Sequence, residues 1–221
     1  MTSKYYDTER VDSLVAEHRH RVVIGGLWEE LGDLQLTTLK QMNLQPHNSV
    51  LDVGCGSLRL GSKLVAYLEP QNYFGTDLNT SLLDAGYERE LSPDLRRKLD
   101  RANLVAHDAT QSLPFQQEFD FLVAFSLFTH LSIEQSELVI RSIAERMHGR
   151  SQLLATFFVA PGDPNTAVEQ RKGIVTYPDR DPFHLNKAQI EKLAQTAGLT
   201  AEELVHTSHP RGQTLYKMHA K

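Results

Sequence analysis

The sequence predicts a doubly wound α/β fold, with a mostly parallel seven-stranded sheet, helices on both faces and a C-terminal antiparallel hairpin. Strand-like and helix-like segments alternate from residue 49 to residue 198. The strand-like run at 119–125 is apolar except for Asp120, which is typical of a parallel strand covered on both faces. The last two strand-like segments have no helix between them, which indicates a hairpin.

Composition restricts the class of protein. The chain has 221 residues, a formal net charge of −5, 40% hydrophobic residues and one cysteine. These values are typical of a folded domain and leave no pair of cysteines for an intramolecular disulfide. The first residues are polar, and no apolar run approaches the roughly 20 residues of a membrane span. We therefore expect a cytoplasmic protein with no membrane partner, and the mild acidity makes nucleic acid an unlikely partner.

The N-terminal part, residues 1–45, is expected to be a helical cap on a single domain that spans 1–221. Residues 28–44 have apolar positions at helical spacing, and Gly25-Gly26 marks a break before them. The basic cluster at 18–21 predicts a solvated face, or alternatively a site for an acidic acceptor or a cofactor carboxylate. Trp28 suits a helix core or a lid, and Tyr5 and Tyr6 either help to close a site or belong to a frayed terminus.

The core, residues 46–221, opens with a strand–turn–helix–strand unit. A strand at 49–53 ends at the glycine-rich turn 54–56, and a helical pattern runs from Leu58 to Leu68. A second strand at 73–77 and a helix at 82–91 follow. Parallel strands joined through a helix need a crossover of about this length.

The alternation then continues to the C-terminus. Strands are expected at 103–106, 119–125 and 152–159, with a helix at 134–147. Residues 160–185 contain four prolines and predict a long irregular insertion. Asn186 and Gln189 have the spacing of a capping box for a helix that ends at Gly198. Strands at 199–206 and 213–219 complete the hairpin.

The candidate site lies at the ends of strands one to four, because ligands of doubly wound sheets bind outside the carboxyl ends of the strands. The glycines allow a sharp turn and close approach of a ligand, and Asp77 is placed to accept hydrogen bonds from ribose hydroxyls. Asp108 can accept a hydrogen bond from the amino group of a purine base, and Leu78 and Ala109 could flank the flat base. The residues at these strand ends are Asp52, Gly54, Cys55, Gly56, Asp77, Leu78, Asn79, Asp108, Ala109, Phe125 and Ser126.

Four stretches together resemble the class I S-adenosylmethionine-dependent methyltransferases. VLDVGCGSLRLG is similar to the first motif of that family, YFGTDLN to its acidic loop, HDATQSLPF to its adenine-binding motif and FDFLVAFSLFTHL to its fourth-strand motif. The resemblance covers about residues 45–160 and implies a Rossmann-like methyltransferase fold and S-adenosylmethionine as cofactor.

The resemblance also implies a role for each matching residue. Gly54 and Gly56 would line the amino-acid end of the cofactor, and Asp52 would lie near its ammonium group. Asp77 would hold the ribose and Asp108 the adenine amino group. The backbone at Phe125 and Ser126 would close over the methionine part, and Cys55 would satisfy a need for a small side chain. Leu58 stands where the family often has a third glycine.

A nicotinamide cofactor is the alternative for such a turn. Its pattern is Gly-x-Gly-x-x-Gly, and here Arg59 stands three residues after Gly56. A side chain at that position would block the helix–strand contact that the third glycine permits. The sequence therefore favours S-adenosylmethionine over a nicotinamide-dependent oxidoreductase, and a non-catalytic binding module remains a further alternative.

Methyl transfer is an in-line displacement, so alignment supplies much of the rate and a base is needed only for a protonated acceptor. His130 follows strand four and is the first candidate base, although it could instead cap or pack the next helix. His184 is a second candidate, or else an ordinary loop residue. The spacing of Asp179, Asp181 and His184 matches no firm metal template, so a charged turn and no metal are expected.

The acceptor is expected to be a small molecule. Strand four lacks the Asn/Asp-Pro-Pro-Tyr run of amino-group methyltransferases that act on nucleic acid and on protein glutamine, and no basic arm is visible. Specificity on such scaffolds lies in loops, so the insertion 160–185 is expected to shape the acceptor pocket with Tyr177 and Phe183. RNA or protein is the alternative acceptor.

Overall fold

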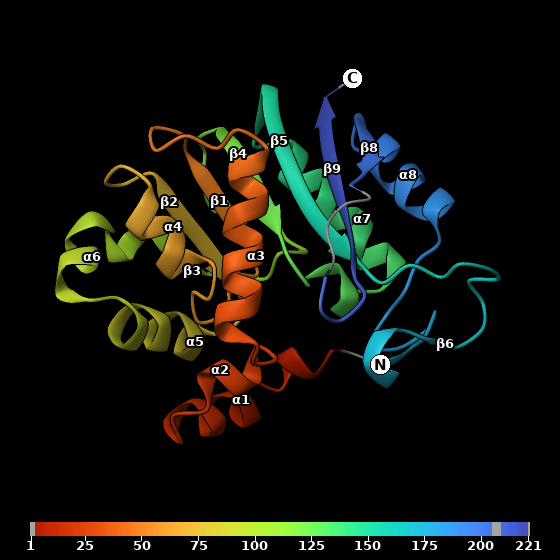
Figure 1. Ribbon diagram of the computed structural model, residues 1–221, viewed down its shortest axis with the longest axis horizontal. Coiled ribbons are helices and arrows are strands. Elements are labelled where there is room, and N and C mark those ends of the chain that lie inside the picture. Colours follow the sequence, from red (N-terminus) through yellow and green to blue (C-terminus); the bar gives the residue numbers. More distant parts are fainter. Residues whose placement is uncertain (1–2, 205–208, 221) are drawn as a thin grey trace. The chain divides into compact units, whose positions relative to one another are not determined.

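The computed structural model describes residues 3–204 and 209–220 (Figure 1). Seven strands form one sheet in the order β3-β2-β1-β4-β5-β9-β8, and β9 runs antiparallel to both of its neighbours. The predicted fold class is therefore confirmed. The strands are β1 (Val50–Val53), β2 (Tyr73–Asp77), β3 (Leu104–Ala106), β4 (Phe119–Ala124), β5 (Met147–Phe157), β8 (Leu199–Glu203) and β9 (Thr214–Ala220).

The helices lie between these strands and before the first of them. In the described part of the chain, no helix is long and apolar enough to cross a membrane. The α-helices are α1 (Thr8–Ala16), α2 (His20–Val23), α3 (Trp28–Gln41), α4 (Gly61–Tyr67), α5 (Thr80–Ala85), α6 (Pro93–Lys98), α7 (Ile133–Ala144) and α8 (Lys187–Thr196). Short helical turns are η1 (Lys4–Tyr6), η2 (Gly86–Glu90, a π-helix), η3 (Arg101–Asn103), η4 (Phe128–His130) and η5 (Arg171–Gly173).

The chain forms two compact units, one over residues 5–109 and one over residues 110–221 together with the N-terminal four residues. The expected cap, residues 1–45, therefore falls almost entirely within the first unit, together with the first half of the core. That unit contains the glycine turn and both aspartates that follow β2 and β3.

In the first unit, β1 pairs in parallel with β2, and β2 pairs in parallel with β3. The helix expected from Leu58 begins at Gly61 instead, because Leu58 has a φ of 65°, which no right-handed helix accommodates. α6 was not expected from the sequence. Ser92 caps it and Pro93 occupies its first turn, a pattern that sequence reasoning could have found.

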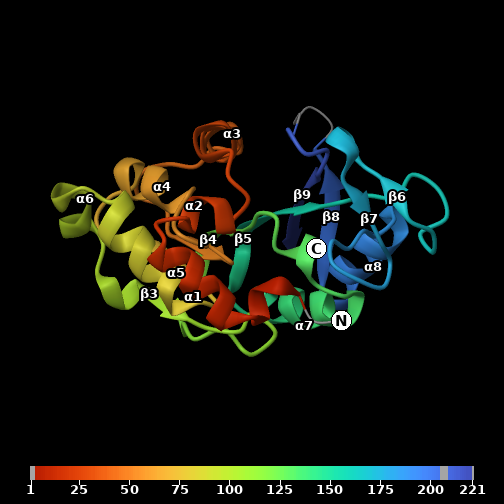
Figure 2. The same cartoon turned by 90° about the horizontal axis from the view of Figure 1, so that it is seen from below.

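The N-terminal helices α1 and α2 belong to the first unit. Val11 and Val15 of α1 pack with Leu82 and Ala85 of α5, and both views show α1 beside α5 (Figures 1 and 2). α1 is short and mostly polar, and only two of its residues are buried. Its apolar stripe is therefore too narrow to be read from sequence periodicity, yet wide enough to fix the helix on α5.

In the second unit, β4 pairs in parallel with β5, and β9 pairs antiparallel with β5 and β8. Phe128, Phe157 and Tyr216 form a run of ring contacts beside this sheet. The expected capping box at Asn186 and Gln189 is present, and a second one occurs at Ser132 and Gln135.

The insertion at 160–185 is largely irregular, as expected, although it contains a small antiparallel pair of strands. These are β6 (Val168–Glu169) and β7 (Val175–Thr176). The strand expected at 199–206 is described as far as Glu203, and residues 205–206 lie outside the described residues.

Candidate functional site

The glycine turn after β1 is tied to the end of β2. The backbone N–H groups of Gly54 and Cys55 donate to the carbonyl of Thr76 at 2.8 and 2.9 Å. Gly54 and Gly56 have φ values of 77° and 57°, which favour glycine. The turn therefore holds its backbone amides in fixed positions next to the end of β2, where Asp77 lies.

Asp77 is oriented by backbone amides. The N–H of Gly56 donates to its Oδ2 at 2.9 Å, and the N–H of Asn79 donates to its Oδ1 at 3.0 Å. Burial raises the pKa of this carboxyl, against the lowering effect of these two hydrogen bonds. Each carboxylate oxygen offers about two acceptor positions, so both keep capacity for a further donor such as a hydroxyl.

Ser57 follows the glycine turn and Asn79 lies two residues after Asp77. Their buried side-chain atoms Ser57 Oγ and Asn79 Oδ1 have no hydrogen-bond partner among the described residues. Buried polar atoms are normally hydrogen-bonded, and unsatisfied ones call for a ligand or water. With the glycine turn and Asp77, they fit a ligand that carries several hydroxyl or amino groups, such as the nucleoside and amino-acid parts of S-adenosylmethionine.

Asp52 lies under the turn, at the end of β1. It is 4% exposed, and the hydroxyl of Tyr73 donates to its Oδ2 at 3.1 Å. Burial raises the pKa of Asp52 to about 7, while the Tyr73 hydrogen bond and the charge of Arg59 lower it. A carboxylate in this position is stabilised by a cation, which is the property needed to hold an ammonium group.

Asp108 follows β3. The structure places Tyr5 and Tyr6, whose role the sequence left open, in contact with this part of the predicted site. The hydroxyl of Tyr6 lies 3.3 and 3.2 Å from the two carboxylate oxygens of Asp108. The side-chain amide of Asn79 donates to the carbonyl of Tyr5 at 3.3 Å. The two tyrosines therefore contact residues of the predicted site and are not part of a frayed terminus.

The structure explains the missing third glycine. Leu58 adopts the left-handed conformation that a glycine would prefer, and its side chain is fully buried. The close helix–strand contact falls instead to Gly61, where an added Cβ would lie 2.4 Å from the Tyr73 hydroxyl. Arg59 does not block this contact, because its guanidinium donates to the carbonyls of Ile24 and Gly26.

Cys55 is held inside the turn. Its side chain is 6% exposed, and burial raises the pKa of its thiol well above the ordinary value. A Cβ added at Gly75 would lie 2.9 Å from its Sγ, so the sulfur packs closely against β2. A thiol in this setting is unreactive, in agreement with the expectation that size determines the residue at this position.

In the second unit, the end of β4 carries the strained residue Ser126, with a φ of 60°. Its backbone N–H donates to Thr156 Oγ1 at 2.7 Å, and its hydroxyl donates to Gln213 Oε1 at 3.0 Å. Backbone strain of this kind persists where surrounding contacts fix it, and it is common at functional sites. Sequence reasoning selected Ser126 and Phe125 and missed Thr156 and Gln213, which are distant in sequence.

His130 forms a carboxylate–imidazole pair. Its Nδ1 lies 2.7 Å from Asp181 Oδ1, and the hydroxyl of Ser3 donates to Asp181 Oδ2 at 3.0 Å. Burial raises the pKa of Asp181, but the hydrogen bonds from His130 and Ser3 hold it below the usual value. The sequence selected His130, and it could not identify Asp181 as its partner because the two residues are 51 positions apart.

His184 has a different environment from the one expected of a base. It is 2% exposed, and its ring nitrogens lie 2.8 Å from Thr176 Oγ1 and 3.0 Å from the carbonyl of Pro164. The structure therefore corrects the prediction that His184 is a candidate catalytic residue, because both nitrogens are engaged in packing the insertion. Across the described ranges, no cluster of histidine, cysteine or carboxylate side chains is arranged to hold a metal ion.

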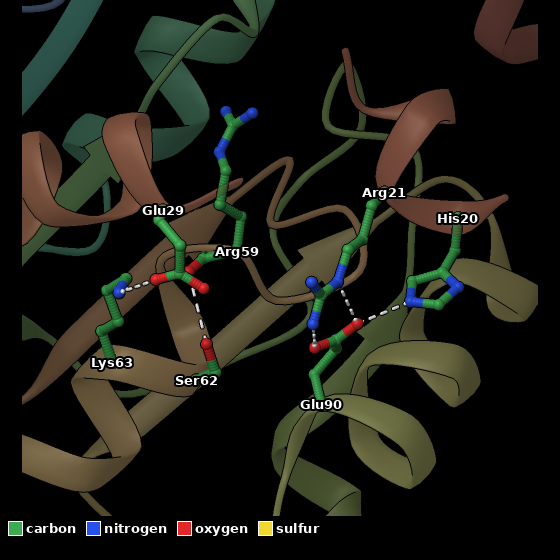
Figure 3. A network of polar contacts seen from close by, with 7 residues as sticks. All are labelled: His20, Arg21, Glu29, Arg59, Ser62, Lys63 and Glu90. Atoms are coloured by element: carbon green, nitrogen blue, oxygen red, sulfur yellow. Dashed lines mark hydrogen bonds and ion pairs between the residues drawn. The ribbon is translucent and has the colours of Figure 1, made fainter. Parts of the chain in front are cut away.

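The basic cluster at 18–21 is only partly a solvated face. His20 is buried, and its Nε2 lies 2.6 Å from Glu90 Oε1 (Figure 3). Arg21 donates to both oxygens of the same carboxylate. Burial raises the pKa of Glu90, but the hydrogen bonds from Arg21 and His20 outweigh it and hold the pKa below its usual value. Arg21 also lies over the ring of Trp28 at 4.4 Å. These contacts fix α2 on η2.

Comparison with known proteins agrees with the fold and the turn. Residues 51–150 match the model of a family described as a methyltransferase domain. A curated relative from Saccharomyces cerevisiae, 18S rRNA (guanine(1575)-N(7))-methyltransferase, is 31% identical over 94 residues. That alignment covers 42% of this chain and only 30% of the length of the yeast protein.

Solved structures show the same fold over most of the chain. Magnesium protoporphyrin IX methyltransferase from Synechocystis PCC 6803, with bound S-adenosylmethionine, matches with a TM-score of 0.65 at 15% identity and covers 97% of both chains. The glycopeptide N-methyltransferase MtfA matches with a TM-score of 0.62 at 16% identity, over 86% of this chain and 90% of its own. An O-methyltransferase from neocarzinostatin biosynthesis matches at 0.65 and 19% identity, over 100% of this chain and 62% of its own.

The matched domain and the fold point to the same class of protein. Residues 51–150 are similar to a methyltransferase domain, and the chain has the fold of solved S-adenosylmethionine-dependent methyltransferases. The stretch that resembles the first motif of that family lies in residues 50–61, and the other three stretches lie at the ends of β2, β3 and β4.

Proposed function

We propose that this chain transfers a methyl group from S-adenosylmethionine to a small-molecule acceptor by in-line displacement. The observation that carries the proposal is the orientation of Asp77. The backbone amide of Gly56 in the glycine turn donates to one of its carboxylate oxygens, and the backbone amide of Asn79 donates to the other. Such a carboxylate is suited to two vicinal ribose hydroxyls. The site residues of this proposal are Asp52, Gly54, Cys55, Gly56, Asp77, Leu78, Asn79, Asp108, Ala109, Phe125 and Ser126.

Each end of the cofactor has a chemically suitable group. Asp52 provides a buried carboxylate for the ammonium, and Asp108 provides an acceptor for the adenine amino group. The sulfonium supplies an activated methyl group when the cofactor is bound, so the protein's task is to align the acceptor and exclude water. These roles need no nucleophilic side chain, which agrees with the unreactive setting of Cys55.

His130 is the proposed base for an acceptor that must lose a proton. Asp181, 2.7 Å from Nδ1, favours the proton on that nitrogen and stabilises the imidazolium that forms after proton abstraction. Nε2 is then the nitrogen that accepts the proton from the acceptor. Asp181 acts through His130, so it is a positioning residue in this proposal.

Small-molecule acceptors agree with the formal charge of −5 and with an insertion that carries Tyr177 and the buried Phe183. They also agree with the names of two structural neighbours, a protoporphyrin methyltransferase and a methyltransferase solved with 1,4-dihydroxy-2-naphthoic acid. We further infer a cytoplasmic location, which suits a single free cysteine.

Binding of S-adenosylhomocysteine tests the cofactor. At saturating concentration it is expected to raise the melting temperature by mass action, whereas NAD is expected to leave it unchanged. Stabilisation by NAD alone would support the oxidoreductase alternative, and no stabilisation by S-adenosylhomocysteine would overturn the proposed function. Binding without methyl transfer to any acceptor would identify a non-catalytic module.

RNA is the second candidate acceptor, and the similarity to the yeast rRNA methyltransferase over 94 residues favours it. A transfer assay with methyl-labelled cofactor on cell extract, fractionated into small molecules, RNA and protein, separates the candidates. Label in the small-molecule fraction is the expected result. Label in RNA or in protein would replace the proposed acceptor class and leave the cofactor assignment standing.

A further inference from the structure

We propose that the N-terminal cap, defined here as residues 5–26, is one wall of the cofactor site, with Tyr6 as a positioning residue at the adenine end and Arg59 as a second positioning residue. This inference rests on the proposed function, because it concerns the same cofactor. It gives Arg59 a role that its place in the first-motif stretch did not suggest, and it gives Tyr6 a specific partner.

The first edge of the cap, at Tyr5 and Tyr6, contacts Asp108, the residue that we propose binds the adenine amino group. The Tyr6 hydroxyl contacts both oxygens of Asp108 at 3.3 and 3.2 Å. These distances exceed the roughly 2.5–2.7 Å of a strong charge-assisted O–H···O⁻ bond, and a carboxylate offers about four acceptor positions. Tyr6 therefore orients Asp108 without exhausting its capacity for a second donor, such as an exocyclic amino group.

The same edge is fixed from a second direction. The side-chain amide of Asn79 donates to the carbonyl of Tyr5 at 3.3 Å, and the Tyr5 hydroxyl donates to the carbonyl of Val23 at 3.1 Å. Asn79 follows Asp77, so the cap is bonded to the loop after β2 as well as to the loop after β3. Tyr5 also links the two edges of the cap to each other.

The other edge of the cap covers the glycine turn. A Cβ added at Gly56 would lie 2.7 Å from Cγ2 of Ile24, so the side chain of Ile24 packs directly against this glycine. The absence of a side chain at Gly56 therefore has a second reason besides its φ of 57°.

The body of the cap is anchored away from the site. α1 packs on α5 through Val11 and Val15, and Glu90 holds His20 and Arg21 of α2 (Figure 3). The Glu90 carboxylate contacts both His20 and Arg21, so it holds α2 in place. We therefore infer that the two edges respond to the cofactor while α1 remains in place.

Arg59 controls the Ile24 edge. Gly25, Gly26 and Leu27 all have positive φ values, 92°, 64° and 51°, so the chain leaves the cap through a run of left-handed residues. The Nη1 of Arg59 donates to the carbonyls of Ile24 and Gly26 at 3.2 and 3.1 Å. A buried guanidinium therefore fixes a conformation that a non-glycine residue such as Leu27 adopts only at a cost.

The same guanidinium influences the methionine end. Its positive charge lowers the pKa of Asp52, against the effect of burial. Arg59 thus acts on both the Ile24 edge and the carboxylate proposed to hold the ammonium. A Lys in its place would keep the charge and lose the two-carbonyl geometry, which allows the two effects to be separated.

The Tyr6→Phe variant tests the positioning role of Tyr6. We expect the dissociation constant of S-adenosylhomocysteine, measured by calorimetry, to rise about 10-fold, because Asp108 loses the hydroxyl that orients it. Tyr67→Phe is the matched control, because the Tyr67 hydroxyl donates to the carbonyl of Leu44 and contacts no residue of the proposed site in the described chain. An unchanged or lowered dissociation constant for Tyr6→Phe would overturn the role, and a lowered one would identify Tyr6 as a competitor of the cofactor.

The Arg59→Lys variant tests the positioning role. We expect its dissociation rate constant for S-adenosylhomocysteine to rise about 10-fold, while the pH dependence of binding stays that of the wild type because the charge is kept. Arg97→Lys, on exposed α6, is the control. An unchanged dissociation rate would show that Arg59 does not hold the edge.

Hydrogen exchange of the wild type tests the cap without a variant. S-adenosylhomocysteine is expected to slow amide exchange at residues 5–7 and 23–27 and to leave the middle of α1 unchanged. If the ligand binds and neither edge is protected, the cap is no part of the site. If the ligand does not bind the wild type at all, the proposed function fails first, so the two failures are distinguishable.

Discussion

Asp77 illustrates how a single carboxylate sets the geometry of the site. The amides of Gly56 and Asn79 hold its two oxygens, so it can be replaced without removing a core side chain. We expect Asp77→Ala to weaken binding of S-adenosylhomocysteine by at least about 100-fold, because two hydrogen bonds to a charged group are lost. Calorimetry measures this, and an unchanged affinity would contradict the ribose role.

His130 and Asp181 are tested together by kinetics. We expect His130→Ala to lower kcat about 100-fold or more with little change in cofactor affinity, because a general base typically contributes about 10²–10⁴-fold. Asp181→Asn should retain the fold and lower kcat by a smaller factor, with a shifted pH–rate profile. Full turnover in the His130 variant would show that this histidine has only a packing role at the end of η4.

At the scale of elements, backbone strain opposes side-chain packing in the turn before α4. Leu58 occupies a left-handed position, which costs about 1–2 kcal/mol, yet its fully buried side chain packs between Gly61 and Gly86. Removal of a buried leucine side chain costs about 2–5 kcal/mol, which exceeds the strain that would be relieved.

We therefore expect Leu58→Gly to reduce the free energy of unfolding by about 1–3 kcal/mol, as measured by urea denaturation. Leu138→Ala, at a position 52% exposed on α7, is the control and should change stability by less than about 0.5 kcal/mol. A Leu58→Gly protein as stable as the wild type would show that strain, and not packing, dominates at this turn.

At the scale of the whole molecule, Asp52 links stability to pH. Its folded pKa, raised by burial to about 7, exceeds that of an unfolded aspartate. The folded state therefore binds an extra proton between about pH 4 and pH 7, so the stability from this group is present below pH 4 and is lost as the pH rises through 7. We expect Asp52→Asn to gain melting temperature over the wild type at pH 8 and much less at pH 5.

The same titration affects cofactor binding with the opposite sign. An ammonium group requires the ionised carboxylate, so affinity for S-adenosylhomocysteine is expected to fall about 10-fold from pH 8 to pH 6. Proton release on binding near pH 7, detected by calorimetry in buffers of different ionisation enthalpy, checks the coupling. Affinity that is independent of pH would show that Asp52 is not the group that meets the ammonium.

The sequence alone predicted the alternation of strands and helices, the C-terminal hairpin and the stretches that resemble cofactor motifs. Apolar runs, glycine turns and the Asn186 capping box are local patterns, and each follows from steric and hydrogen-bonding rules that act within a few residues. They were sufficient to place Asp52, Asp77 and Asp108 at or next to strand ends, and the resemblance to a family rests on these stretches.

Only the tertiary structure decided which distant side chains meet. It paired His130 with Asp181, Tyr6 with Asp108 and His20 with Glu90, and it buried His184. It also assigned the close glycine contact to Gly61 and directed Arg59 toward the cap. Apart from those of His184, these contacts join residues 33 or more positions apart or depend on how a helix sits on a strand, so no local pattern encodes them.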